Sequence, residues 1–328
     1  MIALAACAAD TARAAIPEGP RLAVVKWDVF EGRFVLETID RAGAQPLRLA
    51  GGGERKRPLP EIFEAPTWSP DGTRIAFVGV SHSLEAGLRG DRLYVVGADG
   101  RGLKPLLGTR GSISPVFAPD GNSIAFARLR RRGASIWLTD LEGGSPRRIT
   151  PPRRGLYLFP SSFSPDGGTL LATRYADRKE EIVAVNRSTG AFETVLRRAG
   201  EPVYSPDGTR IALLRWRPLR RRDGTRTVSS DLFTIRPDGS GLRRLTDTRF
   251  QDEAYLSWNP SGERLAFVRY LPEYTKNELI ETGIGASVAQ VNADGTCPKE
   301  ILKPSFIAIY GAAWQPGPGR EAGRIKCR

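Results

Sequence analysis

Few residues in this chain of 328 could carry out acid–base or nucleophilic chemistry. Its single histidine, His82, lies between two serines, and no G-x-S-x-G nucleophile motif occurs. A Ser-His-Asp triad needs a histidine beside a nucleophile and a carboxylate, so we interpret His82 as a solvated loop residue. The carboxylate pairs Asp252/Glu253 and Glu180/Glu181 lack metal-ligand spacing, although oxygen ligands would favour calcium. We therefore predict no catalytic residue, no metal site and no cofactor.

The three cysteines suggest export. Cys7 ends Leu4-Ala5-Ala6-Cys7, which is similar to the lipobox at which bacterial lipoproteins are lipidated, and segment 1–20 also fits the remnant of an ordinary signal peptide. Cys297 and Cys327 then remain as a pair, for which we predict a disulfide, two free thiols being the alternative. The expected location is the periplasm or cell surface, either without an anchor or with lipidated Cys7 as the one membrane attachment.

Arginine dominates the charge of the chain. There are 49 basic and 36 acidic residues, a formal charge of +13, and eight of the basic residues are lysines. Arginine runs lie at 128–132 and 220–222, with pairs such as 153–154 and 197–198. They indicate either an anionic partner or a solvated surface, because they are scattered along the sequence. RNA-binding aromatic motifs are absent, so we expect no sequence-specific nucleic-acid binding.

An internal repeat predicts the elements that position these residues. Trp68-Ser69-Pro70-Asp71-Gly72 and the apolar run after it recur with an aromatic residue always two positions before proline. Proline presets φ for a turn, aspartate tolerates the next position and glycine takes the left-handed one, so each copy predicts a strand–turn–strand hairpin. The repeat residues, to which we assign a structural role, are Trp68, Pro70, Asp71, Gly72, Phe117, Pro119, Asp120, Gly121, Phe163, Pro165, Asp166, Gly167, Tyr204, Pro206, Asp207, Gly208, Trp258, Pro260, Trp314 and Pro316.

A second hairpin with an Asp/Asn-Gly turn follows in each full repeat, giving four strands per roughly 40–50 residues. The sixth repeat ends after its first strand, at 308–316, and segment 21–50 supplies three more strands. We predict an all-β fold, a single six-bladed β-propeller over 21–316 with four-stranded antiparallel blades. Blade six is a clasp shared by 21–50 and 308–316. Residues 1–20 are a leader or flexible segment, 317–328 a C-terminal tail, and the protein is expected to be a monomer.

The repeated W-S-P-D-G…A-D-G pattern resembles the WD-like repeat of the TolB β-propeller family over residues 21–316. The resemblance implies a bacterial periplasmic or cell-surface propeller that binds other proteins. TolB proteins have an α/β domain before the propeller, which we do not expect here, so their partners are not carried over. The repeat is also similar to the propeller of prolyl-oligopeptidase-type peptidases, whose hydrolase domain and G-x-S-x-G motif have no counterpart in this sequence.

Propeller topology predicts which face carries a binding site. The PDG and ADG turns share one face, while loops 79–91, 215–230 and 269–285 and the connections between blades share the other. Loops that differ between blades are where function usually lies, and aromatic and arginine side chains are enriched at binding hot spots. The predicted partner-binding residues are Trp216, Arg217, Arg220, Arg221, Arg222, Tyr270, Tyr274, Tyr157 and Tyr255.

The sequence therefore predicts a non-enzymatic, exported scaffold that binds an envelope protein or an anionic polymer. Two alternatives remain open. One is a propeller enzyme acting on a lactone, glycan or peptide in a channel site, and the other is the ectodomain of a sensor.

Overall fold

A computed structural model shows an all-β molecule. The residues it describes are 21–28, 33–50, 61–80, 92–142, 144–220, 226–248, 251–270, 285–303 and 309–316, together with Ile325 and Cys327. Within these ranges the chain forms twenty-four strands and no helix. The described part of the chain thus offers no apolar helix of membrane-spanning length.

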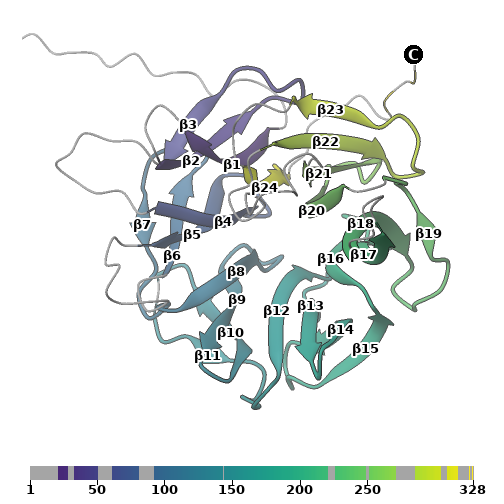
Figure 1. The fold of residues 1–328 in the computed structure, drawn as a ribbon. Helices are drawn as coiled ribbons and strands as arrows, with labels where there is room; N and C mark the ends of the chain where they lie inside the picture. Colours follow the sequence, from purple (N-terminus) through teal and green to yellow (C-terminus); the bar gives the residue numbers. More distant parts are fainter. Residues whose placement is uncertain are drawn as a thin grey trace, which may run out of the picture.

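The strands form six four-stranded antiparallel sets, termed blades 1 to 6, in a ring around a central channel (Figure 1). Blades 2 and 3 are joined into a single sheet by one parallel pair, Ala134 with Tyr157. Each blade begins with its innermost strand and ends with its outermost, in chain order, except for blade 6. This arrangement agrees with the predicted four strands per repeat.

Blade 1 contains β4 (Glu61–Trp68), β5 (Arg74–Val80), β6 (Arg92–Gly97) and β7 (Lys104–Pro105). Blade 2 contains β8 (Ser112–Phe117), β9 (Ser123–Arg130), β10 (Gly133–Asp140) and β11 (Arg147–Arg148). Blade 3 contains β12 (Tyr157–Phe163), β13 (Thr169–Ala176), β14 (Lys179–Asn186) and β15 (Phe192–Arg197). Blade 4 contains β16 (Gly200–Tyr204), β17 (Ile211–Arg220), β18 (Arg226–Ile235) and β19 (Arg243–Arg244). Blade 5 contains β20 (Asp252–Trp258), β21 (Arg264–Tyr270), β22 (Ala286–Asn292) and β23 (Lys299–Leu302). Blade 6 contains, from the inside outward, β24 (Ile309–Trp314), β1 (Leu22–Asp28), β2 (Arg33–Ile39) and β3 (Leu47–Ala50).

Blade 6 joins the two ends of the described propeller, as the sequence predicted. β24 pairs with β1 in antiparallel register from Leu22 opposite Trp314, and the backbone N–H of Gln315 donates to the Arg21 carbonyl at 2.7 Å. The buried Arg21 guanidinium in turn donates to the hydroxyl and carbonyl oxygens of Thr38 on β2, at 2.8 and 2.7 Å. Closing the ring in this way gives β1 a partner on both sides, so its edge is not exposed for aggregation.

The first-hairpin turns have the chemistry that the repeat predicts. In blade 1, Gly72 is left-handed at φ 67° and its N–H donates to the Ser69 carbonyl at 2.8 Å. The Asp71 carboxylate accepts from the Ser69 hydroxyl and from the Thr73 N–H, and the Ser69 hydroxyl bond is the largest cause that lowers the pKa of Asp71. Proline, aspartate and glycine are therefore explained by the turn itself.

The hydrophobic core lies between blades rather than inside them. Phe77 and Ile75 of blade 1 pack with Val25 of blade 6, and Phe126 of blade 2 packs with Leu93 of blade 1. Each neighbouring pair of blades shares such a cluster in the described residues. Because the apolar faces of the blades pack against one another, the side chains of the innermost strands that face the channel are not needed for this core.

One predicted loop is wrong. Residues 215–230 were expected to form a loop, but β17 and β18 pair continuously from Ile211 opposite Ile235 to Arg220 opposite Arg226. The arginines in this segment are typical of loops, yet strand propensity depends on cross-strand partners, which this hairpin supplies along its length. The predicted loop at 269–285 also starts too early, since Tyr270 pairs with Ala286 in the β21–β22 ladder.

The predicted Cys297–Cys327 disulfide is present, with Cα atoms 5.1 Å apart. Asn292 holds the same tail by two hydrogen bonds with the backbone of Ile325, at 3.0 and 2.9 Å. The C-terminal segment is thereby attached to the outer turn of blade 5.

Candidate functional site

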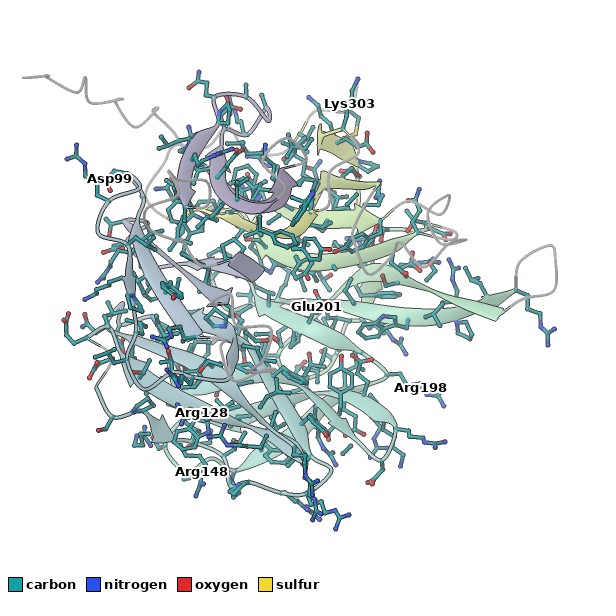
Figure 2. All side chains as sticks on the ribbon, turned by 60° about the vertical axis from the view of Figure 1, so that its left-hand side comes forward. Asp99, Arg128, Arg148, Arg198, Glu201 and Lys303 are labelled. Carbon is teal, nitrogen blue, oxygen red and sulfur yellow. A yellow bond between two sulfur atoms is a disulfide. The ribbon has the colours of Figure 1, made fainter. Side chains whose placement is uncertain are left out.

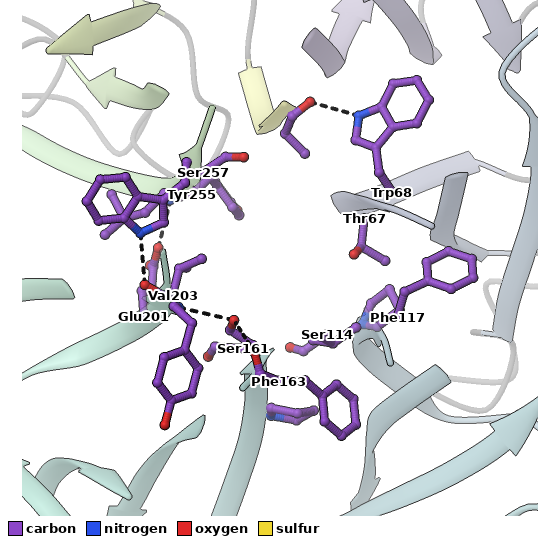
Figure 3. Close-up of a pocket in the computed structure, with 18 of the residues that line it drawn as sticks. Thr67, Trp68, Ser114, Phe117, Ser161, Phe163, Glu201, Val203, Tyr255 and Ser257 are labelled. Carbon is purple, nitrogen blue, oxygen red and sulfur yellow. Dashed lines mark hydrogen bonds between the residues drawn. The ribbon is translucent and has the colours of Figure 1, made fainter. Parts of the chain in front are cut away.

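The six innermost strands enclose a channel cavity of about 750 Å³ (Figure 3). Toward the PDG turns its wall is apolar and is built by the repeat itself. The lining there comes from Trp68, Phe117, Phe163, Tyr204, Trp258 and Trp314, with Pro70, Pro119, Pro206 and Pro316. Two of the tryptophans also link blades, since the Trp68 indole N–H donates to Ala313 O at 2.9 Å and that of Trp258 to Val203 O at 3.0 Å. These residues therefore have both a structural role and a place in the cavity wall.

Toward the other face the channel wall is polar and its backbone is irregular. Ser114, Glu201 and Tyr255 each stand three residues before the repeat aromatic of their blade and have left-handed φ values of 52°, 48° and 57°. At each of them the pairing of the innermost strand shifts register, between Ile113 and Val116, Gly200 and Val203, and Ala254 and Ser257. β-bulges re-aim side chains, and left-handed non-glycine residues are strained. Three equivalent bulges thus face the same cavity.

Glu201 is the ionisable group at the centre of this polar end. One carboxylate oxygen accepts the Tyr255 N–H at 2.7 Å, which links blade 4 to blade 5 (Figure 3). The Glu201 N–H donates to the Thr173 hydroxyl at 2.9 Å. Protein atoms surround the carboxylate although channel water can reach it, and this burial raises the pKa of Glu201 to about 7. The Tyr255 N–H opposes the rise and the nearby Glu180 carboxylate adds to it.

Burial also raises the pKa of Glu180 itself, against the effect of a hydrogen bond with Tyr175. Tyr175 lines the cavity and is 41% exposed. The polar end of the channel therefore has the Glu201 carboxylate in its wall, and a second carboxylate with a raised pKa, that of Glu180, lies against the lining residue Tyr175. Such groups can accept a hydrogen bond, hold a proton near neutral pH or face a cationic ligand.

The predicted partner-binding residues are only partly brought together. Tyr255 lines the cavity, on strand β20 rather than on a blade connection, and Tyr157 likewise begins β12. The Tyr270 hydroxyl donates to Ile309 O at 3.2 Å, between blades 5 and 6. Trp216 lies against Gly200, whose Cβ position is 2.7 Å from the indole ring. Of these residues Tyr255 lines the channel, and Trp216 contacts Gly200 next to the lining residue Glu201.

The arginines behave differently. Arg217 lies 3.5 Å from carboxylate oxygens of both Asp231 and Asp247, in an ion-pair network with Arg244, so a structural role accounts for it. Arg220 is exposed at the end of β17. Arg221, Arg222, Tyr274, Cys7 and His82 lie outside the described residues.

Sequence reasoning missed Ser114 and Glu201. The available signal was position, because each stands three residues before a repeat aromatic, where neighbouring blades have other residue types. No group of three or more His, Cys, Asp or Glu suited to holding a metal occurs among the described residues.

Comparison with known proteins places this geometry in a family. The TolB β-propeller domain model matches residues 49–200. An uncharacterised protein of Agrobacterium fabrum is 30% identical over 219 residues, covering 64% of this chain and 67% of that protein. The Tol-Pal system protein TolB of Anaeromyxobacter dehalogenans is 34% identical over 125 residues, and the match covers 35% of this chain but only 25% of that protein.

Solved structures agree on the fold. TolB from Acinetobacter baumannii superposes with a TM-score of 0.69 at 20% identity, covering 90% of this chain and 67% of that one. A putative TolB from Agrobacterium tumefaciens has a TM-score of 0.60 at 19% identity and is covered completely, with 91% of this chain matched. The chain belongs to the TolB-like β-propeller family.

Proposed function

We propose that this propeller is an exported binding protein that seats a partner protein over the polar mouth of its channel and carries out no chemistry on it. The observation that carries the proposal is the set of equivalent bulges at Ser114, Glu201 and Tyr255. Glycine or asparagine would adopt these φ values at lower cost, by about 1–2 kcal/mol per residue, so we infer that the side chains kept there serve the channel as well as the fold.

The positions of the strained residues also indicate on which face the partner binds. Most left-handed residues on the PDG and ADG turns are glycines, such as Gly72, Gly100 and Gly121, and Gln45 and Cys297 are the exceptions. Along the channel wall, the left-handed non-glycine residues Ser114, Glu201 and Tyr255 lie toward the opposite face, which carries the blade connections and the turns between the second and third strands of each blade. The Cys297–Cys327 disulfide and the TolB relatives support export to an oxidising compartment.

Site-specific photo-crosslinking tests this proposal. A crosslinking amino acid in place of Tyr175, at the polar mouth, should capture a defined partner band from envelope extract of the producing cell. The same amino acid in place of Arg101, on an exposed ADG turn of the opposite face, is the matched control and should capture none. Equal capture from both positions, or capture from Arg101 alone, would contradict a partner at the mouth.

A second candidate function rests on Glu201. A carboxylate with a pKa of about 7 in a cavity of about 750 Å³ is suited to general acid–base catalysis at neutral pH. Turnover of lactone or uronate-glycan substrates that is lost in Glu201→Gln, with a rate profile centred near that pKa, would favour this enzymatic alternative. Partner capture at Tyr175 that persists in Glu201→Gln, without any turnover, favours the binding role.

A further inference from the structure

Arginines that are scattered along the sequence converge in space on blades 2 and 3. In a propeller, the turn between the second and third strands and the connection to the next blade lie on the same face. Arg131 and Arg132 form the β9–β10 turn, and Arg153 and Arg154 lie on the connection from β11 to β12. The two segments touch, since the Gly155 N–H donates to the Arg132 carbonyl at 2.8 Å.

Close packing of these segments leaves no room between them. A Cβ on Gly133 would lie 2.7 Å from the carbonyl oxygens of both Arg153 and Leu156. The glycine therefore allows the β9–β10 turn to sit directly on the blade connection. The backbones that carry these four arginines are thereby held against each other.

Blade 3 repeats the arrangement with its own turn and connection. Arg178 is in the β13–β14 turn, and Arg198 follows β15 on the way to blade 4. The Arg198 N–H donates to the Glu180 carbonyl at 2.8 Å, so turn and connection touch here too. The six arginines 131, 132, 153, 154, 178 and 198 are termed the basic patch, and it borders the channel mouth at Glu180.

The basic patch is free to bind. All six side chains are exposed, and none forms an ion pair with an acidic side chain among the described residues. On the opposite face some arginines are used internally, as Arg187 pairs with Asp120 at 3.0 Å and Arg74 with Asp71 at 3.7 Å. Figure 2 shows Asp99 of that face and Arg198 on opposite sides of the ring.

The backbone gives an independent indication. Arg178 and Arg198 have left-handed φ values of 60° and 57°, in positions where glycine or asparagine is the usual residue. Among the residues that the structure describes, no ion pair of Arg178 or Arg198 offsets this strain. Strained residues that nothing in the fold explains cluster at functional sites.

We infer that the basic patch binds an acidic segment of a partner protein, by guanidinium–carboxylate pairs. This inference rests on the proposed function, since it gives the chemistry of a partner seated on the same face. The charge pattern favours a protein segment over a uniform polyanion, because the acidic Asp177 shares the exposed turn with Arg178 and the Glu180 carboxylate lies near the Arg198 segment, against Gly200. A polypeptide can place neutral or basic residues at those points, whereas a phosphate polymer cannot. Guanidinium forks bind carboxylates in bidentate geometry, which fits the preference for arginine.

Binding of a defined probe tests the inference. Fluorescence anisotropy measures binding of a labelled peptide of alternating glutamate and serine to the full chain, at about 0.05 M and about 0.5 M salt. The double variant Arg131→Glu/Arg153→Glu should bind about tenfold more weakly at low salt. Arg41→Glu/Arg101→Glu is the matched control, because it changes net charge equally at exposed arginines of the opposite face, and should bind within about twofold of wild type.

Each outcome decides the inference. Equal weakening in both double variants would mean that binding follows net charge alone and would overturn the patch. The proposed class of partner would be overturned if polyphosphate of the same total charge bound the patch more tightly than the peptide does. Tighter binding of vesicles that contain anionic phospholipid would overturn it in the same way. Any of these results would overturn the inference about the basic patch without changing the crosslinking result at Tyr175, so the proposed function is tested separately.

Discussion

Glu201 shows at the scale of one residue how backbone and charge work together. Its φ of 48° turns the carboxylate toward the Tyr255 N–H of the neighbouring blade, at 2.7 Å. Burial there raises its pKa to about 7 from an ordinary value of 4.5. The folded protein thus binds a proton at this site more tightly than the unfolded chain does.

This linkage predicts that the protein loses stability as the pH rises through the pKa of Glu201. Between about pH 4.5 and 7 the folded state binds more protons than the unfolded one, so the free energy of unfolding falls with increasing pH over that window. Glu201→Gln keeps a hydrogen-bond acceptor for Tyr255 and should be more stable than wild type by about 1–2 kcal/mol at pH 8, with channel water screening part of the burial.

Denaturant unfolding of both proteins at several pH values measures this difference. The two free energies should converge at pH 4, where the glutamate is protonated in both states. Glu180 and Glu253 also have pKa values raised by burial and contribute to the overall slope, so only the difference between the two proteins reports on Glu201. A constant difference across the pH range would contradict the raised pKa.

At the scale of elements, the first-hairpin turn of one blade holds the next blade in place. The Arg210 guanidinium lies 4.9 Å from the centre of the Trp258 ring and donates to Gly262 O at 2.8 Å, so blade 4 binds the turn of blade 5. Arg74 occupies the same turn position in blade 1 and donates to Gly121 O of blade 2 at 3.1 Å. Two of the arginines in the repeat thus act as links between blades.

Arg210→Ala should lower the free energy of unfolding by about 1–2 kcal/mol, from the lost hydrogen bond and cation–π contact. Arg210→Lys retains the charge but not the planar stacking, and should lose less. Arg101→Ala is the control, as this exposed arginine on a second-hairpin turn has no side-chain partner in the described part of the chain. Chemical denaturation compares the four proteins, and equal stability of Arg210→Ala and wild type would remove the link between blades.

At the scale of the whole molecule, stability depends on closing the ring. β24 is the innermost strand of blade 6, and Trp314 packs in the core shared with blade 5. β1 pairs with β24 on one side and β2 on the other, so the two ends of the propeller hold each other. The disulfide adds a second attachment at the periphery, on blade 5.

Removing residues 309–328 should therefore abolish cooperative unfolding. It opens the edge of β1 and exposes the apolar face of blade 5, which favours aggregation. Cys297→Ser/Cys327→Ser is the control that removes the tail attachment but keeps β24. It should stay folded and monomeric with a loss of at most about 2–4 kcal/mol, since it only relaxes a constraint on the unfolded chain. Thermal melts with light scattering distinguish the truncated chain from the cysteine variant. A truncated chain that stays monomeric and unfolds cooperatively would show that ring closure is dispensable.

Most of the architecture could be predicted because the repeat encodes it locally. Pro70, Asp71 and Gly72 determine a turn by their own backbone preferences, and the aromatic residue two positions before proline marks the innermost strand. The extended β17–β18 hairpin was not predictable in this way. Its strand conformation comes from the partner strand, since Arg215 to Arg220 have no local pattern that excludes a loop.

The sequence by itself determined the number of blades, the closing pair of segments and the disulfide, because turn chemistry and repeat spacing act over a few residues at a time. The tertiary structure alone decided which residues meet. Arg132 and Gly155, or Glu201 and Tyr255, are brought together only when separate turns, connections and blades pack side by side. The candidate site and the basic patch arise from that packing, for which a scattered set of arginines and one glutamate gives no local signal.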